Sequence, residues 1–141
     1  MSTIWQKQIH ISPKKRGFHL ITDELRGQLP ELSEVSQGLC HLFLQHTSAS
    51  LCLNENTDPQ VTQDMEMYFL ETIPNKSYFT HTQEGDDDMP AHIKSALLGT
   101  SLLLPVNEGD FALGTWQGIF LGEHRKRAFQ RHIFVSITAS S

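Results

Sequence analysis

The 141-residue sequence has few of the features that mark membrane or secreted proteins. No apolar run approaches the roughly 18 residues needed to cross a bilayer, so we expect no membrane partner. The N-terminus shows no apolar segment followed by a small-residue cleavage site, which predicts a cytoplasmic protein. Cys40 and Cys52 are too few for a disulfide framework, and both lie in apolar runs. Free cysteines in such places act as small hydrophobic side chains.

Internal repeats, linkers and low-complexity segments are also missing, and the length is that of one ordinary domain, residues 1–141. The net charge of -5 argues against a protein that binds nucleic acid by neutralising phosphates. The charges are nevertheless segregated. Asp86 to Asp88 form an acidic run, whereas residues 123–132 hold a basic segment. Segregated charge indicates localised sites.

The pattern of turns and apolar residues predicts an α+β fold with short strands and two to three short helices. Thr22 is expected to cap a helix that stops at Pro30, Asp58-Pro59 to begin a second, and Pro90 a third. Helical spacing predicts that four residues of the second helix are buried in the core: Val61, Met65, Tyr68 and Phe69. Strands are expected over residues 3–12, 38–46, 50–54, 101–106, 111–121 and 133–138.

In the expected strand 111–121, alternation places Trp116 on one face between glycines. Two interpretations are open for this arrangement. The glycines either make room for a bulky core ring or leave a pocket in which Trp116 or Gln117 contacts a planar ligand.

The eight histidines are the most informative feature, because several lie beside hydroxyl or carboxylate groups. His46-Thr47-Ser48 follows an apolar run, where a rigid strand can present polar groups at its end. His81, the acidic run and His92 gather imidazoles and carboxylates on a loop and the start of a helix, which suits a divalent ion. Imidazole favours zinc and carboxylate favours magnesium, and the spacing matches no strict motif, so both metals remain open. Alternatively, the acidic run only stabilises the N-terminus of the helix.

Several segments are similar to the YjbQ family, and the resemblance runs from about Trp5 to about Thr138. It implies a single compact domain with a large, mostly antiparallel β-sheet or sandwich, and assembly as a homotrimer. It also implies a weak thiamine-phosphate synthase activity, which joins a pyrimidine methyl diphosphate to a thiazole phosphate and releases diphosphate. The segments are His46 to Ser50, Leu53 to Asn56, Asp58-Pro59, Glu84 to Lys94, Leu98 to Ser101 and Gly114 to Gly118.

The same resemblance implies a set of site residues. Lys94 and Arg125 would bind phosphate oxygens, and Trp116 would stack on a ring. A trimer would also allow the acidic run of one chain to face the basic segment of the next. The catalytic candidates are His46, Ser48, His92, Glu123 and His124; the substrate-binding candidates are Thr47, Lys94, Trp116, Gln117 and Arg125; the candidates for binding Mg or Zn are His46, His81, Asp88 and His92.

Two other functions fit the same residues. One is a metal-dependent hydrolase of a phosphorylated metabolite, in which water or Ser48 is the nucleophile and a histidine the base. Ser48 lacks the elbow motif of many serine hydrolases. The other is a non-catalytic trimeric protein that binds a phosphorylated metabolite, which needs neither a metal nor a proton carrier.

Overall fold

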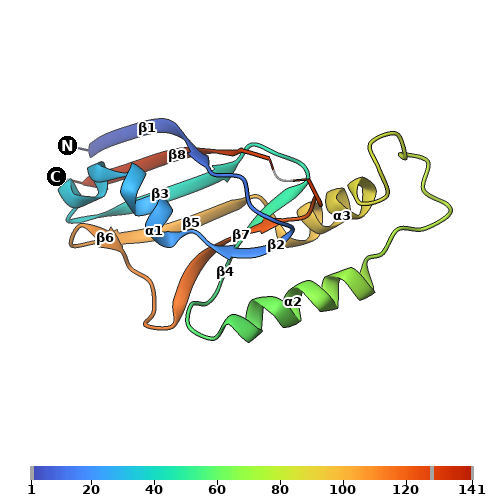
Figure 1. Cartoon of the computed structure of the whole chain (residues 1–141). Helices are drawn as coiled ribbons and strands as arrows, with labels where there is room; N and C mark the ends of the chain where they lie inside the picture. Colours follow the sequence, from blue (N-terminus) through green and yellow to red (C-terminus); the bar gives the residue numbers. More distant parts are fainter. Residues whose placement is uncertain (1, 128, 141) are drawn as a thin grey trace.

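The computed structural model describes residues 2–127 and 129–140, in which two antiparallel sheets are combined with three α-helices and one 3-10 helix (Figure 1). This confirms the predicted α+β class. In chain order the elements are β1 (Ser2–Ile11), β2 (Gly17–Leu20), α1 (Thr22–Gln28), the 3-10 helix η1 (Pro30–Glu34), β3 (Gln37–Leu44), β4 (Ala49–Glu55), α2 (Pro59–Thr72), α3 (Asp88–Leu98), β5 (Ser101–Asn107), β6 (Asp110–Phe111), β7 (Gln117–Glu123) and β8 (Arg131–Ser140).

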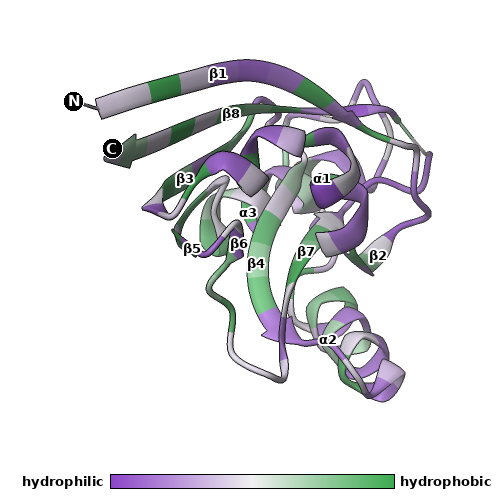
Figure 2. Cartoon of the chain, turned by 90° about the vertical axis from the view of Figure 1, so that its left-hand side faces the viewer, coloured by the Kyte–Doolittle hydropathy of each residue, from purple (hydrophilic) through white to green (hydrophobic). Residues whose placement is uncertain are grey.

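The larger sheet has the strand order β1-β8-β3-β5-β6, and the smaller sheet has the order β2-β7-β4. β3 is central in the larger sheet, where Cys40 lies opposite both Ile137 and Leu104. β1 and β8 pair along their whole length, so the two ends of the described chain lie side by side (Figures 1 and 2). β7 is central in the smaller sheet and carries the residues that precede the basic segment.

The hydrophobic core contains side chains of both sheets and of α1. Leu42 and Leu44 come from the larger sheet, Leu51 from the smaller one and Leu25 from α1, and none is more than 2% exposed. The period of two in a strand explains why Leu42 and Leu44 share one face, as predicted. Phe43 between them points to the other face and is 45% exposed, so the core covers one face of β3 only.

The helix starts were predicted with mixed success. Asp58 caps α2 as expected, because its carboxylate accepts a hydrogen bond from the backbone N–H of Gln60 at 2.9 Å. Thr22 is not a cap: it is the first residue of α1, and its hydroxyl accepts a hydrogen bond from the Ile119 N–H at 2.9 Å. That bond ties α1 to β7 instead of closing the helix end.

The predicted burial of α2 is wrong. None of its residues is fully buried, and Tyr68 is 62% exposed. The helix packs beside β2 at one side of the domain, below the sheets in both views (Figures 1 and 2). A helix that contacts the domain along one side leaves much of its surface uncovered, whatever the spacing of its apolar residues.

The single strand predicted over 111–121 is also wrong. β6 ends at Phe111 and β7 begins at Gln117, with a loop between them. A hydrogen bond of 2.9 Å from the Gly114 N–H to the side-chain oxygen of Gln117 closes the turn. Trp116 in that turn is 65% exposed, so it is neither a core ring nor the wall of an enclosed pocket within one chain.

A long connection, residues 73–87, leads from α2 to α3 (Figure 1). α3 begins at Asp88, two residues before the predicted start, and packs against β4. It ends at Gly99, as predicted, where φ is 98°, a conformation that glycine adopts without steric cost. In the part of the chain that the structure describes, no helix is both long and apolar enough to span a membrane.

Candidate functional site

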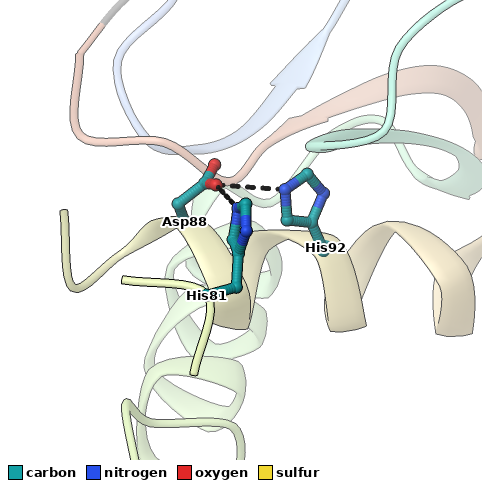
Figure 3. Close-up of side chains that lie close together, drawn as sticks. All are labelled: His81, Asp88 and His92. Atoms are coloured by element: carbon teal, nitrogen blue, oxygen red, sulfur yellow. Dashed lines mark hydrogen bonds and ion pairs between the residues drawn. The ribbon is translucent and has the colours of Figure 1, made fainter. Parts of the chain in front are cut away.

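Three of the four predicted metal ligands converge at the start of α3 (Figure 3). Asp88 and His92 are four residues apart, so they lie on the same side of the helix, and His81 approaches from the preceding connection. The Asp88 Oδ2 atom lies 2.6 Å from His81 Nε2 and 3.1 Å from His92 Nε2. The possible ligand atoms of the three residues all lie within 4.8 Å of one another.

The second ring nitrogen of His92 is held by the backbone. Its Nδ1 lies 2.7 Å from the carbonyl oxygen of Thr47, so the Nδ1–H group donates to that oxygen. In a neutral ring this leaves Nε2 with a lone pair that faces the Asp88 oxygen. A proton or a cation between these two atoms would stabilise the arrangement. Backbone carbonyls orient histidine ligands of metals in the same way.

Asp88 is ionised at neutral pH although it is only 1% exposed. Burial acts to raise the pKa of its carboxyl, but the hydrogen bond from His81 and the charges of His92 and Arg125 outweigh burial and keep the pKa below its ordinary value. The Asp88 Oδ1 atom accepts a hydrogen bond of 2.8 Å from Arg125. The other oxygen, Oδ2, is the one that faces the two imidazoles.

The donor set fits a divalent transition metal. Two imidazoles and one carboxylate are ligands of zinc in hydrolytic enzymes and of non-haem iron in oxygenases. Three protein ligands leave coordination positions open for a substrate, which distinguishes catalytic from structural zinc sites. Magnesium is bound mainly through carboxylates and water, so His81 and His92 favour zinc or its neighbours over magnesium.

His46, the fourth predicted metal ligand, is not part of this group. Its Nε2 atom accepts a hydrogen bond of 2.8 Å from the backbone N–H of His132. Burial, together with the nearby charges of Arg131 and His132, lowers the pKa of His46 to about 4. His46 and Thr47 instead line a cavity of about 510 Å³, to which His92 also contributes. His46 is therefore placed as a neutral ring in the wall beside His92, one of the candidate metal ligands.

Glu123 forms a buried ion pair instead of a free acid–base group. Its carboxylate is 0% exposed and accepts hydrogen bonds from Arg131 Nε at 2.7 Å and from Arg131 Nη2. Arg131 also donates to the carbonyl oxygen of Ser48 at 3.3 Å. Sequence reasoning missed Arg131. The signal was the period of two in this strand, which places Arg131 on the same face as the apolar Ile133 and Val135, where a charge needs a buried partner.

Ser48 is buried beside this pair, and no acid–base partner of its hydroxyl occurs in the described parts of the chain, residues 2–127 and 129–140. His124, another catalytic candidate, is 1% exposed. Its Nε2 atom lies 2.8 Å from the hydroxyl oxygen of Ser50. Burial and the charges of Lys94 and Arg131 lower its pKa to about 3. Neither residue lines the cavity beside His92 and the candidate metal ligands.

Arg125 joins the basic segment to the acidic run within one chain. Its guanidinium donates to Asp87 at 2.9 Å, to Asp88 at 2.8 Å and to the Glu84 carbonyl at 2.8 Å. Within one chain, Arg125 thus brings the basic segment and the acidic run together. It also occupies the donors of Arg125 that were expected to bind phosphate.

Trp116 and Gln117 lie far from the candidate metal ligands within this chain. Gln117 is the first residue of β7 and Trp116 precedes it, whereas Glu123 ends the strand two residues before Arg125, which contacts Asp88. Six residues of a strand span about 20 Å. Lys94, the remaining substrate-binding candidate, is 2% exposed and lines a second, smaller cavity together with His124. The structure therefore gathers Thr47, His81, Asp88 and His92, and separates them from Trp116 and Gln117.

The chain belongs to the YjbQ family. The family described as UPF0047 protein YjbQ-like matches residues 7–140. The UPF0047 protein YjbQ of Escherichia coli O157:H7 is 56% identical over 133 residues, which cover 94% of this chain and 96% of that protein. A UPF0047 protein of a Synechocystis strain is 41% identical, over 94% of this chain and 90% of that protein.

Solved structures show the same fold. A YbjQ-like protein from Sulfolobus solfataricus P2 superposes with a TM-score of 0.83 at 29% identity and covers 99% of this chain and 100% of its own. A YjbQ/UPF0047 family protein from Clostridium acetobutylicum superposes with a TM-score of 0.78 at 32% identity, over 93% of this chain and 98% of its own. The match extends over nearly the whole domain and includes α3.

Proposed function

We propose that this protein is a divalent-metal-dependent enzyme that transfers a group of a phosphorylated metabolite, with thiamine-phosphate synthase chemistry as the specific reaction. The observation that supports this proposal most strongly is the convergence of His81, Asp88 and His92 beside an open cavity. The enzyme would join a pyrimidine methyl diphosphate to a thiazole phosphate and release diphosphate.

Each residue of the proposed site has its own role in the reaction. A divalent ion at the three ligands would supply Lewis acidity toward a diphosphate oxygen. Asp88 supplies the negative charge of the ligand set, and Arg125 keeps that carboxylate ionised and fixed. The Thr47 carbonyl keeps Nε2 of His92 available for coordination. The departing diphosphate would leave with its charge partly neutralised, which lowers the barrier to transfer.

The cavity of about 510 Å³ beside His92 has room for the substrate, since pockets for small metabolites measure roughly 300 to 1,000 Å³. Phe43 provides an apolar surface in its wall, and Thr47, Ser95 and Thr100 provide polar groups. This mixture suits an aromatic heterocycle that carries a polar group, such as a substituted pyrimidine.

Hydrolysis of a phosphorylated metabolite is a second candidate reaction, favoured by the composition of the ligand set. Two histidines and one carboxylate are also the zinc ligands of hydrolytic enzymes, where the ion activates water. Both reactions require the same three metal ligands. They differ in the accepting group, which is the thiazole phosphate in the transferase reaction and water in hydrolysis.

We also propose that the protein is a homotrimer, as the family resemblance implies. Several large apolar side chains are exposed on the single chain, which supports an interface between copies. These residues include Tyr68 at 62%, Leu97 at 66%, Leu103 at 63% and Trp116 at 65% exposure.

Turnover by protein that has been stripped of metal tests the proposed function. Thiamine phosphate formation and phosphate release are measured after addition of zinc, manganese or magnesium, for wild type, His81→Ala, His92→Ala and the matched control His10→Ala. His10 is an exposed residue of β1 outside the ligand group. Metal-dependent product formation that is lost in the first two variants and kept in the control is the expected result. Turnover that persists without metal, or in His81→Ala and His92→Ala, would rule out the proposal.

A further inference from the structure

A second cavity, of about 210 Å³, lies against α3 on the side opposite the metal ligands. Pro90 and Lys94 line it, and each follows a metal ligand, Asp88 or His92, by two residues. At 100° per residue, two residues turn the side chain to the far side of a helix. The charged and titratable lining residues are Arg16, Asp86, Asp87, Lys94, His124 and Lys126.

Lys94 brings a buried positive charge to this cavity. The residue is 2% exposed, and burial lowers the pKa of its ammonium group. The two carboxylates whose charges oppose this effect have other cationic partners: Glu66 Oε2 lies 3.4 Å from Arg16, and Asp87 Oδ2 lies 2.9 Å from Arg125. The second oxygen of Glu66, Oε1, is buried without a hydrogen-bond partner within the described chain. Among the described residues, no carboxylate lies within ion-pair distance of Lys94. A buried ammonium without an anionic partner is unfavourable, so this position is suited to an anion.

His124 adds an unused hydrogen-bonding atom. Its Nδ1 atom is buried and has no hydrogen-bond partner within the described chain, while Nε2 lies 2.8 Å from the Ser50 hydroxyl. If the Ser50 hydroxyl donates to Nε2, the proton of the neutral ring is on Nδ1. That tautomer satisfies Ser50 and leaves a single unpaired N–H donor on a residue that lines the cavity.

We propose that this cavity binds the phosphoryl group of a phosphate ester, with Lys94 and the Nδ1–H group of His124 as buried donors and Arg16 and Lys126 as further cations. The carboxylate of Asp87 at its edge is already bound by Arg125 and by the backbone N–H of Lys126. The cavity is smaller than the roughly 300 Å³ at which pockets begin to enclose whole metabolites, so it takes one anionic group. The site is distinct from the metal centre, and its occupancy does not depend on a metal.

Binding of inorganic phosphate and methyl phosphate in the presence of a chelator tests this site. Calorimetry is performed on wild type, Lys94→Met and the control Lys7→Met, which removes the same charge from β1 outside the cavity. Saturable binding is expected in wild type, weakened roughly 10- to 100-fold in Lys94→Met by loss of a charged hydrogen bond, and unchanged in Lys7→Met. The double variant His81→Ala/His92→Ala should keep wild-type phosphate affinity, which separates this site from the proposed metal centre.

A measurement on wild type alone makes the test independent of whether Lys94→Met folds. In protein with ¹⁵N-labelled histidine, the His124 resonances should show the Nδ1–H tautomer and should shift on phosphate addition, whereas those of His10 should not. Absence of saturable phosphate binding, equal weakening by Lys7→Met, or an unshifted His124 would overturn the proposal.

Discussion

The buried ion pair between Glu123 and Arg131 permits a quantitative stability prediction. Glu123 is 0% and Arg131 3% exposed, and the pair joins the end of β7 to the start of β8. Arg131→Met would leave the enclosed carboxylate without a cationic partner, with only the hydrogen bond of 3.1 Å from the Arg125 N–H, and this costs roughly 3 to 5 kcal/mol of unfolding free energy. For a chain of this size, each kcal/mol corresponds to about 3 °C in Tm, so a decrease of about 10 °C or more is expected.

Removal of both charges distinguishes a buried pair from simple loss of packing. The double variant Glu123→Gln/Arg131→Met should be more stable than the sum of the two single variants predicts, by about 2 kcal/mol or more. The control Lys7→Met breaks a surface pair with Glu31, at side-chain exposures of 37% and 19%, and should cost less than about 1 kcal/mol.

The assay is urea unfolding followed by circular dichroism, at one protein concentration for all variants because assembly would couple stability to concentration. A cost below about 1 kcal/mol for Arg131→Met, or strictly additive effects, would refute the assignment of Glu123 as a structural ion-pair partner.

Three further predictions concern stability and assembly. The unfolding free energy should fall by about 2 kcal/mol more between pH 7 and pH 5 in wild type than in His124→Gln, measured by urea unfolding. Burial keeps the pKa of folded His124 at about 3, so the unfolded chain binds the proton first and stability is lost as pH falls from about 6.5. Gly38→Ala should lower Tm strongly because its Cβ would overlap the Thr138 carbonyl oxygen, whereas Gly27→Ala, with open space around it on α1, should raise stability by roughly 0.5 to 1 kcal/mol. Light scattering should give about 48 kDa, three chains of 16.0 kDa each, and a mass near 16.0 kDa would contradict the trimer.

The features of the fold that depend on neighbouring residues could be predicted from the sequence. The Asp58-Pro59 start of α2 and the Gly99 end of α3 are set by local hydrogen bonding and backbone geometry. The alternation along β3 correctly predicted that Leu42 and Phe43 lie on opposite faces of the strand, the first buried and the second partly exposed. These features follow from the backbone itself, so a single sequence contains the information.

Features that depend on distant parts of the chain could not be predicted. Helical spacing in α2 is compatible with a core helix, yet Tyr68 is exposed because only one side of the helix has a neighbour. The strand expected across Trp116 is interrupted by a turn that a side-chain contact of Gln117 closes. On α2 the position of its tertiary neighbours outweighs the local pattern, whereas at Trp116 a short-range side-chain contact between Gly114 and Gln117 outweighs the alternation.

The candidate site was also only partly predictable from the sequence. Asp88 and His92 could be grouped from the sequence as neighbouring carboxylate and imidazole donors, but their place on one side of a helix depends on α3 beginning at Asp88, two residues before the predicted start. The ion-pair partners of Glu123 and Arg125 could not be deduced, because several acidic and basic residues lie nearby in the sequence. Arg131, only eight residues further along the chain, binds Glu123, whereas the acidic run that binds Arg125 lies 37 and 38 residues away.

Metal binding to His81, Asp88 and His92 is the central claim, and titration calorimetry with zinc and manganese on metal-stripped protein tests it most directly. One ion per chain is predicted for wild type and for His10→Ala, with binding abolished or strongly weakened in Asp88→Asn and His92→Ala. Wild-type affinity in Asp88→Asn and His92→Ala, or no binding by the wild-type protein, would contradict the account.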